Sequence, residues 1–198
     1  SLARPGGMVT GLTNIAGDVA EKHLEFLLEM RPGARRIGFL SDPGNLNLPL
    51  MMDGVRRSIA RFKVEPQFAE ATRPEQIEQA FAHLAAHGID ALVLLKSAMF
   101  RVEHARIAAI ALRHRWPVIT EERALTEAGV LLSYGHDSIH NYRRAAYFVD
   151  RILKGTEPGY LPIEQPTRIE LVINLKTAKA LGIEVPPMLL ARADEVIE

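Results

Sequence analysis

The 198-residue sequence is long enough for one domain with a substantial core, and 47% of its residues are apolar. Its 24 Lys and Arg residues balance its 24 Asp and Glu residues, so it lacks the basic excess that phosphate backbones require, and nucleic acid is not an expected partner. The absence of cysteine excludes disulfides and thiolate nucleophiles, and no stretch reaches the roughly 20 uninterrupted apolar residues that cross a bilayer.

Short apolar runs alternate along the chain with segments of helical period, a pattern typical of a parallel sheet covered by helices. The sequence therefore predicts an α/β fold with three layers, α/β/α, and a mostly parallel sheet. In chain order the predicted elements are helix 18–30, strand 36–40, helix 48–62, strand 63–71, helix 74–86, strand 91–95, helix 102–114, strands 117–120 and 129–134, helix 138–154 and strand 170–173.

Prolines affect the structure predicted for two segments of the chain. Strand 63–71 contains Pro66, which cannot donate to a strand ladder, so this strand is predicted to lie near an edge of the sheet. Residues 154–166 contain three prolines and two glycines and are predicted to form an extended connection.

In an open parallel sheet, ligands bind beyond the carboxyl ends of the strands, so the polar residues that follow each apolar run are candidates for a binding site. In the first such loop Asp42, Asn45 and Asn47 could bind a polar ligand, and Asn45 is the stronger candidate. In the second, Ser97 and Lys96 could hold a carboxylate. In the third, Glu121 and Glu122 could bind an ammonium group or act as a catalytic carboxylate.

Each candidate also has a purely structural interpretation. Asp42 would start a turn at the Pro-Gly pair that follows it, and Asn47 would be a helix N-cap. Lys96 would be a solvated surface lysine. Glu121 and Glu122 are adjacent and point in different directions, so a shared-proton pair is not expected.

Other site chemistry is weakly supported by the sequence. His136 and His140 are four residues apart, a spacing that can serve a metal, but no third ligand is evident and no metal is expected. No GxGxxG follows a strand, and neither a phosphate-binding GxxxxGK[ST] loop nor a GxSxG nucleophile motif is present. The sequence therefore predicts neither a cofactor nor hydrolase chemistry.

Three stretches carry a family resemblance: "SLARPGGMVTGLTN", "LLSYGHDSIHNYRRAAYFVDRILKG" and "LPIEQPTRIELVINLKTAKALGIEVPPMLLARADEVIE". They resemble the ABC-transporter substrate-binding proteins of the tryptophan/tyrosine-binding type. The likeness runs from the first residue to the last. The terminal block, from "QPT" through "INLKTAKALG" to "PPMLLARADEVIE", is its most specific part.

The resemblance implies a periplasmic-binding-protein-like (type I) lobe. Members of the family have two α/β lobes joined by crossing strands, with a small molecule such as an amino acid held in the cleft. Residues 1–135 would form the second-lobe domain, residues 136–166 a helix and connection that return toward the first lobe, and residues 167–198 the strand and helices that complete the second lobe. By this resemblance, an export signal and most of the first lobe would precede Ser1.

By this resemblance, Asn45 matches the second asparagine of an Asn-Pro-x-Asn loop that is usual in the family. Four other positions depart from the family pattern. Asp42 replaces an amide with a charge, and Ser97 stands where aspartate is usual. Met8 replaces the asparagine of "GGNVTG", and His136 stands where proline is common. The new charge at Asp42 would favour a ligand with a cationic group.

The sequence and the resemblance together predict the solute-binding component of an ABC import system. It would bind an amino-acid-like ligand through Asp42, Asn45, Ser97 and Glu121, work with an ABC permease outside the cytoplasm, and not be an enzyme. Two alternatives are a ligand-sensing or oligomerisation module of the same fold, and a small α/β hydrolase or lyase that uses Glu121 with Lys96. The absence of a nucleophile motif counts against the second.

The predicted helix 138–154 has a continuous apolar stripe. Its residues are Ile139, Tyr142, Ala146, Val149 and Leu153, which are three, four, three and four positions apart. A stripe of this kind needs a partner. We expect the helix to pack against its equivalent in another copy, giving a homodimer, or to swap onto a neighbouring chain through the connection that follows it.

Overall fold

The computed structural model describes residues 1–13, 19–165 and 168–198. The chain forms two compact units. Unit 1 consists of the described parts of residues 1–15 and 136–169, and unit 2 of the described parts of 16–135 and 170–198. Residues 1–13 therefore lie with the 136–169 segment and not with the rest of 1–135. Asp18, the predicted first residue of a helix, and Pro166 and Thr167 of the "QPT" motif lie outside the described residues.

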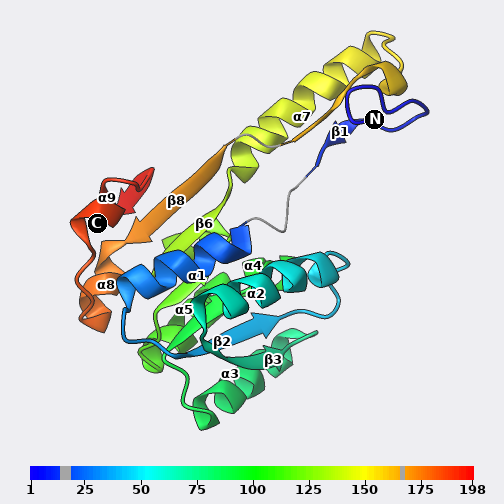
Figure 1. Ribbon diagram of the computed structural model, residues 1–198. Helices are drawn as coiled ribbons and strands as arrows, with labels where there is room; N and C mark the ends of the chain where they lie inside the picture. Colours follow the sequence, from blue (N-terminus) through cyan, green and yellow to red (C-terminus); the bar gives the residue numbers. More distant parts are fainter. Residues whose placement is uncertain (14–18, 166–167) are drawn as a thin grey trace. The chain divides into compact units, whose positions relative to one another are not determined.

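Unit 2 contains a seven-stranded sheet with helices on both faces (Figure 1). The strand order is β3-β2-β4-β5-β6-β8-β9, and every pair whose register is described is parallel. The strands are β2 (Arg36–Ser41), β3 (Glu65–Glu70), β4 (Ala91–Leu94), β5 (Val118–Thr120), β6 (Leu132–His136), β8 (Ile169–Asn174) and β9 (Glu195–Ile197). The predicted mostly parallel sheet is confirmed, and the Pro66 strand lies at its edge as expected.

The helices of unit 2 are α1 (Val19–Met30), α2 (Leu48–Phe62), the 3-10 turn η1 (Pro74–Gln76), α3 (Ile77–Ala86), α4 (Ala98–Val102), α5 (His104–Arg113), α6 (Arg123–Glu127), α8 (Leu175–Leu181) and α9 (Pro187–Leu190). Of these, α1, α2, η1 with α3, and α5 fall close to the four predicted ranges, and the helix predicted at 102–114 corresponds to α5. The short helix α4 precedes it and starts where the Ser97 hydroxyl accepts a hydrogen bond from the Met99 N–H.

The two faces of the sheet are buried in separate clusters, which makes unit 2 a three-layer structure. Along β4, Ala91 and Val93 face the cluster formed with α1 and α2, whereas Leu92 and Leu94 face the cluster formed with α3 and α5. Both sides of this central strand are thus apolar, which explains why it appears in the sequence as an unbroken run.

One strand prediction needs correction, and one strand was not predicted. The predicted strand 129–134 is displaced, since β6 runs over Leu132–His136. At the end of the chain, β9 adds an edge strand in parallel register with β8. Leu189 of α9 is fully buried in the same cluster as α1, which anchors this return.

Unit 1 is small and is built around one long helix, α7 (Ser138–Leu153), which lies beside β1 (Gly11–Leu12) (Figure 1). β1 pairs in parallel with β7 (Ile163–Glu164), and a 3-10 turn, η2 (Pro158–Tyr160), precedes β7. The predicted extended connection at 154–166 therefore contains a short turn and a short strand. Gly159 is required in the turn, because a Cβ there would lie 2.6 Å from the Gly7 carbonyl oxygen.

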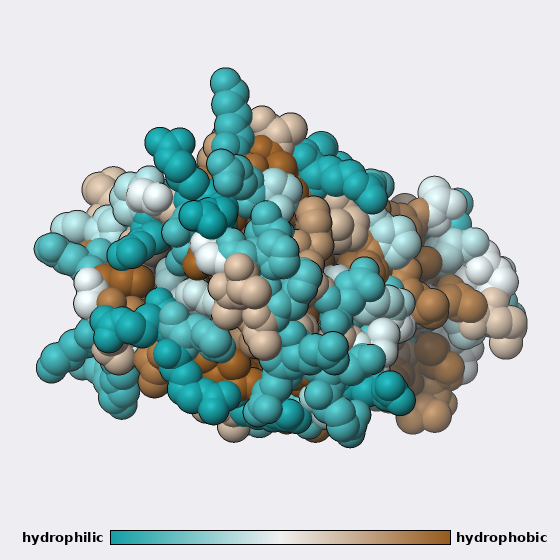
Figure 2. All heavy atoms as spheres, turned by 90° about the horizontal axis from the view of Figure 1, so that it is seen from below, coloured by the Kyte–Doolittle hydropathy of each residue, from teal (hydrophilic) through white to brown (hydrophobic). Residues whose placement is uncertain are grey.

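The surface seen from below in Figure 2 is covered mainly by hydrophilic side chains, with apolar patches between them. Among the residues that the structure describes, no helix combines the length and the apolar character needed to cross a membrane.

Candidate functional site

The loop after β2 is shaped by the side chain of Asp42. Its Oδ1 accepts a hydrogen bond from the Gly44 N–H at 2.8 Å, and its backbone carbonyl accepts one from the Asn45 N–H at 3.0 Å. Asp42 therefore starts a turn at the Pro-Gly pair, as its structural interpretation predicted. Only one carboxylate oxygen is used by this turn, so Oδ2 is available for another contact.

That contact comes from the loop after the neighbouring strand, β4. The hydroxyl of Ser97 donates to Asp42 Oδ2 at 2.6 Å and also accepts from the Met99 N–H at 3.1 Å. Ser97 is 2% exposed, so this hydroxyl is fixed in one orientation by a donor on one side and an acceptor on the other. The two loops are linked by a charge-assisted hydrogen bond.

Asn45 makes a second link between the same two loops. Its Nδ2 donates to the Lys96 carbonyl oxygen at 2.7 Å, and its Oδ1 accepts from the Asn47 N–H at 3.0 Å. Asn47 occupies the N-cap position of α2, but its side chain makes no capping hydrogen bond. The capping interpretation of Asn47 is therefore correct for its position and wrong for its side chain.

Glu121 follows β5 and is a buried carboxyl group, with 8% of the residue exposed. Burial raises its pKa to about 7, the nearby Lys96 opposes this shift, and the neighbouring Glu122 adds to it. The Lys96 Nζ lies 4.0 Å from one carboxylate oxygen of Glu121 and 3.5 Å from one of Glu122. Lys96 is thus partly covered and faces two carboxyl groups, so its interpretation as a fully solvated surface lysine is wrong.

The structure brings the four predicted site residues together at the carboxyl edge of three adjacent strands, β2, β4 and β5. Asp42 contacts Ser97, Asn45 contacts the backbone of Lys96, and the side chain of Lys96 reaches Glu121. We call these four residues, together with Lys96 and Glu122, the carboxyl-edge network. Three of its members are carboxyl groups and one is a cation, so it offers more acceptors than donors to a ligand.

One buried titratable residue of unit 2 was not identified from the sequence. His23 of α1 is 1% exposed, and its Nε2 lies 2.7 Å from the Tyr134 carbonyl oxygen, so this nitrogen carries the proton. Burial lowers the pKa of His23 to about 4, partly offset by that hydrogen bond. Its position on the apolar face of helix 18–30 was the available signal, and it indicates a neutral core histidine.

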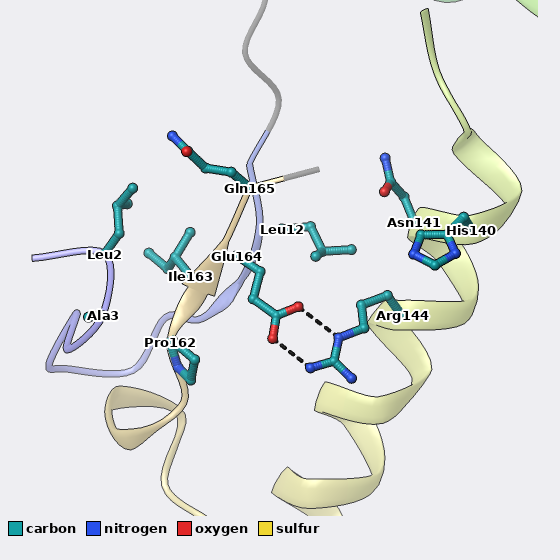
Figure 3. A pocket seen from close by; sticks show the side chains of 10 residues that line it. All are labelled: Leu2, Ala3, Leu12, His140, Asn141, Arg144, Pro162, Ile163, Glu164 and Gln165. Carbon is teal, nitrogen blue, oxygen red and sulfur yellow. Dashed lines mark hydrogen bonds and ion pairs between the residues drawn. The ribbon is translucent and has the colours of Figure 1, made fainter. Parts of the chain in front are cut away.

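Unit 1 contains a cavity of about 590 Å³ between α7 and the β1–β7 pair (Figure 3). Arg144 points from α7 to Glu164 on β7, and the two side chains form two hydrogen bonds, of 2.7 and 2.5 Å. The remaining lining is mostly apolar on the strand side, with Leu12 and Ile163. Arg144 and Glu164 satisfy each other, and the polar side chains of His140, Asn141 and Gln165 also line this cavity.

The two histidines considered as metal ligands lie on different elements. His136 ends β6 and His140 lies on α7. In residues 1–13, 19–165 and 168–198, no group of three or more His, Cys, Asp or Glu side chains is arranged to hold a metal ion.

Sequence comparison extends these observations. The profile of the ABC transporter substrate binding protein family matches residues 1–197. A curated tyrosine-binding protein of Clostridioides difficile is 23% identical over 184 residues, which are 93% of this chain and 52% of that protein. The chain thus spans about half the length of this relative.

Solved structures give the same picture of the fold. A conserved domain protein from Vibrio cholerae superposes with a TM-score of 0.89 at 28% identity, covering 99% of this chain and 65% of that one. An ABC domain from Streptococcus pneumonia in complex with L-Trp gives a TM-score of 0.88 at 21% identity, covering 100% and 67%. The fold is that of type I periplasmic binding proteins, as the family resemblance implied.

Proposed function

Since this chain belongs to the ABC transporter substrate-binding protein family, we propose that it binds an amino-acid-like small molecule at the carboxyl-edge network as the solute-binding component of an import system. The observation that carries the proposal is the linkage of Asp42, Ser97, Lys96 and Glu121 at one edge of the parallel sheet. This is where ligands of open α/β sheets bind. The family is one of solute-binding proteins and not of enzymes.

The charges of the network favour a ligand that carries a cationic group. Asp42 has one oxygen engaged with the backbone of its own turn and the other with Ser97, so its charge is held in place. Lys96 balances only part of the negative charge of Asp42, Glu121 and Glu122. An ammonium or guanidinium group would therefore find acceptors, and the amide of Asn45 would contribute polar contacts.

The relatives add to this proposal. One protein is described as tyrosine-binding and another was solved with L-Trp, so amino acids are the first ligands to test. We further propose that the protein works outside the cytoplasm and delivers its ligand to an ABC permease.

Binding by the 198-residue chain alone should be weak. Ligand sites of this size bury about 70–90% of the ligand surface, whereas the carboxyl-edge network covers one side. We therefore expect dissociation constants in about the millimolar range for L-tryptophan, L-tyrosine and L-arginine.

Two-dimensional amide NMR titration tests the proposal, because it detects weak binding and locates it. We expect ligand-induced shifts around Asn45, Ser97 and Glu121, and reduced affinity in Asp42→Asn, which keeps the oxygen of the turn but removes the charge. Asp53→Asn, an exposed carboxylate on α2, is the matched control and should bind as the unmodified chain does. Shifts confined to the unit 1 cavity, or none at saturating ligand, would refute the proposal.

A further inference from the structure

The starts of the parallel strands of unit 2 carry a group of arginines, at the edge of the sheet opposite the carboxyl-edge network. Three precede β2 and two lie between the end of α5 and β5, and all five are exposed. We call this set the amino-edge patch: Arg31, Arg35, Arg36, Arg113 and Arg115. In the described part of the chain, no carboxylate lies within 4.0 Å of any of these five guanidinium groups. By contrast, Arg123 and Arg192 of unit 2 have carboxylate partners at 2.6 and 3.0 Å.

The two groups of arginines lie on either side of the start of β4. Asp90, which precedes β4, accepts the backbone N–H groups of Arg35 and Arg36 through its Oδ2, both at 2.8 Å. On its other side β4 pairs in parallel with β5, and Arg115 stands shortly before that strand. Since β2 and β5 are two strands apart, the patch spans about 10 Å across the sheet.

The carboxylates near the patch offset only part of its charge. Glu65 lies beside Arg36 at the start of β3, and Asp90 and Glu184 line the same hollow as Arg31. The chain as a whole has a formal net charge of +0. Unit 2 therefore carries exposed cations at one edge of its sheet and the carboxyl groups of the carboxyl-edge network at the other.

Helix ends alone do not account for the patch. A cation at the end of a helix is stabilised by the helix dipole, which explains Arg113 in the last turn of α5. Arg35 and Arg36 lead into a strand and gain nothing from this effect. Arg115 has a φ of 57°, whereas the corresponding position after α3 is taken by Gly88 with a φ of 61°. An arginine in backbone that favours glycine is strained, and such strain points to a role for the side chain.

The amino-edge patch lies away from the connections of unit 2 to unit 1. The chain passes between the units before α1, after β6 and before β8. α1 begins and β6 ends at the carboxyl edge, and the hydrogen bond from the Asp137 N–H to the Arg168 carbonyl oxygen, at 3.4 Å, places the start of β8 there too. Ser1 belongs to unit 1, so a segment that preceded it would continue from unit 1 and not from the patch.

We propose that the amino-edge patch adsorbs the protein onto the anionic headgroups of a phospholipid bilayer. Guanidinium groups form bidentate hydrogen bonds with phosphate oxygens, and an anionic bilayer surface attracts cations that lie close to it. A patch about 10 Å wide meets several headgroups at once, whereas a single phosphate ion would meet only part of it. The proposal rests on the proposed function in one respect, because a protein that serves an ABC permease works beside a bilayer.

The patch fits a bilayer surface better than an acidic protein. The centre of a protein interface usually carries an aromatic or apolar anchor. Trp116, which follows the patch in the chain, is 8% exposed and stacks on Phe81 and His114, with ring centroids 5.8 and 4.6 Å apart. Trp116 is therefore covered and does not provide such an anchor. With the patch on the bilayer, the carboxyl-edge network at the other end of the strands stays open to ligand.

Co-sedimentation with lipid vesicles at roughly 50 mM salt, where surface charges are weakly screened, tests the proposal. The chain should bind vesicles of phosphatidylglycerol and phosphatidylcholine in equal amounts, and not vesicles of phosphatidylcholine alone. The double variant Arg35→Gln, Arg115→Gly removes two charges, and glycine suits the left-handed backbone of position 115. It should weaken partitioning by about 25-fold, at roughly fivefold for each cation beside an anionic surface.

The double variant Arg73→Gln, Arg101→Gln is the matched control. It removes the same net charge from two exposed arginines that follow β3 and β4 at the carboxyl edge. Partitioning should weaken by less than about threefold, because charges far from the bilayer are screened. Far-ultraviolet circular dichroism checks that each variant is folded.

Absence of binding to the anionic vesicles would overturn the proposal, and so would equal losses in the two double variants. Binding that persisted on phosphatidylcholine would also overturn it, and would assign adsorption to exposed apolar residues such as Leu153 of α7. Binding to poly-L-glutamate without binding to vesicles would indicate an acidic protein partner instead. These measurements contain no amino-acid ligand, so their failure is distinguishable from failure of the ligand titration.

Discussion

Glu121 and His23 are buried titratable residues whose pKa values are displaced in opposite directions by the same cause. Burial raises the pKa of Glu121 from 4.5 to about 7 and lowers the pKa of His23 from 6.5 to about 4. In both cases the neutral form is favoured in the folded state. The two residues therefore contribute opposite slopes to the pH dependence of stability.

The sign of each slope follows from proton linkage. The unfolded chain ionises Glu121 near pH 4.5 while the folded chain keeps it protonated, so stability falls as pH rises from there to about 7. The unfolded chain protonates His23 below pH 6.5 while the folded chain does not, so stability falls as pH drops toward about 4. Each effect is about 3 kcal/mol at roughly 1.4 kcal/mol per pKa unit.

We predict that Glu121→Gln changes the shape of the pH–stability curve. With the Glu121 contribution removed, the free energy of unfolding should rise with pH across the range in which His23 loses its proton. The variant should also be more stable than the unmodified chain above neutral pH. Urea denaturation at a series of pH values measures this, and an unchanged curve would show that Glu121 is ionised normally.

Ligand affinity should depend on pH through the ionisation of Glu121. L-Arginine keeps its guanidinium charge throughout, so its binding should tighten by about fivefold from about pH 6 to about pH 8 as Glu121 ionises, equivalent to ~1 kcal/mol at a partly solvated site. NMR titrations at the two pH values provide the measurement. Glu121→Gln should bind equally at both, and a pH dependence that persisted in this variant would assign the effect to another group.

Gly135 is the residue of β6 that allows close approach to the chain after β5. A Cβ at this position would lie 2.2 Å from the Glu121 backbone carbonyl oxygen, and backbone cannot move aside as a flexible side chain can. We predict that Gly135→Ala destabilises the protein by about 3 kcal/mol or more. Gly33→Ala is the matched control, since its added methyl group would contact nothing within 4 Å. Equal stability of the two variants in thermal unfolding would contradict the prediction.

At the scale of elements, the strand-to-helix junction between β8 and α8 is fixed by one buried side chain. The Asn174 Oδ1 accepts from the Thr177 N–H at 3.0 Å and caps α8, while Nδ2 donates to the Thr126 carbonyl oxygen at 2.9 Å. The same residue ends a strand, starts a helix and ties both to α6. The nearly unbroken "INLKTAKALG" of the sequence is possible because no separate loop is needed.

We predict that Asn174→Ala lowers the free energy of unfolding by about 2–3 kcal/mol, through loss of the cap and an unsatisfied carbonyl group. Asn47→Ala provides the comparison. Asn47 stands at the N-cap position of α2 but makes no side-chain capping bond, so its loss should cost less than about 0.5 kcal/mol. Chemical denaturation of the two variants measures both changes, and similar losses in the free energy of unfolding would refute the prediction.

At the scale of the whole molecule, the two units differ in how much apolar surface they bury. Unit 2 has a cluster on each face of its sheet, whereas in α7 only Phe148 is buried. We expect the amides of α7 to exchange with solvent faster than those of β4 in hydrogen-exchange mass spectrometry at low protein concentration. Equal protection at high dilution would show that unit 1 is stabilised by contacts other than its own core.

The sequence by itself determined the alternation of strands β2 to β6 and β8 with helices α1, α2, α3 and α5 in unit 2, and the edge on which the candidate residues lie. Strands such as β4 are apolar on both faces, and parallel strands place their carboxyl ends together, so Asp42, Ser97 and Glu121 could be grouped without coordinates. Pro66 likewise placed β3 at an edge, because its missing N–H is a property of the residue alone.

Only the tertiary structure decided how those residues are connected and charged. The hydrogen bond from Ser97 to Asp42 joins positions 55 apart in the chain, and no local pattern encodes it. The pKa of Glu121 depends on burial by its surroundings, and the β9 strand depends on a free edge of β8 that short-range propensity does not reveal. Local periodicity is a property of neighbours in sequence, whereas register, desolvation and cross-loop hydrogen bonds arise between segments that folding brings together.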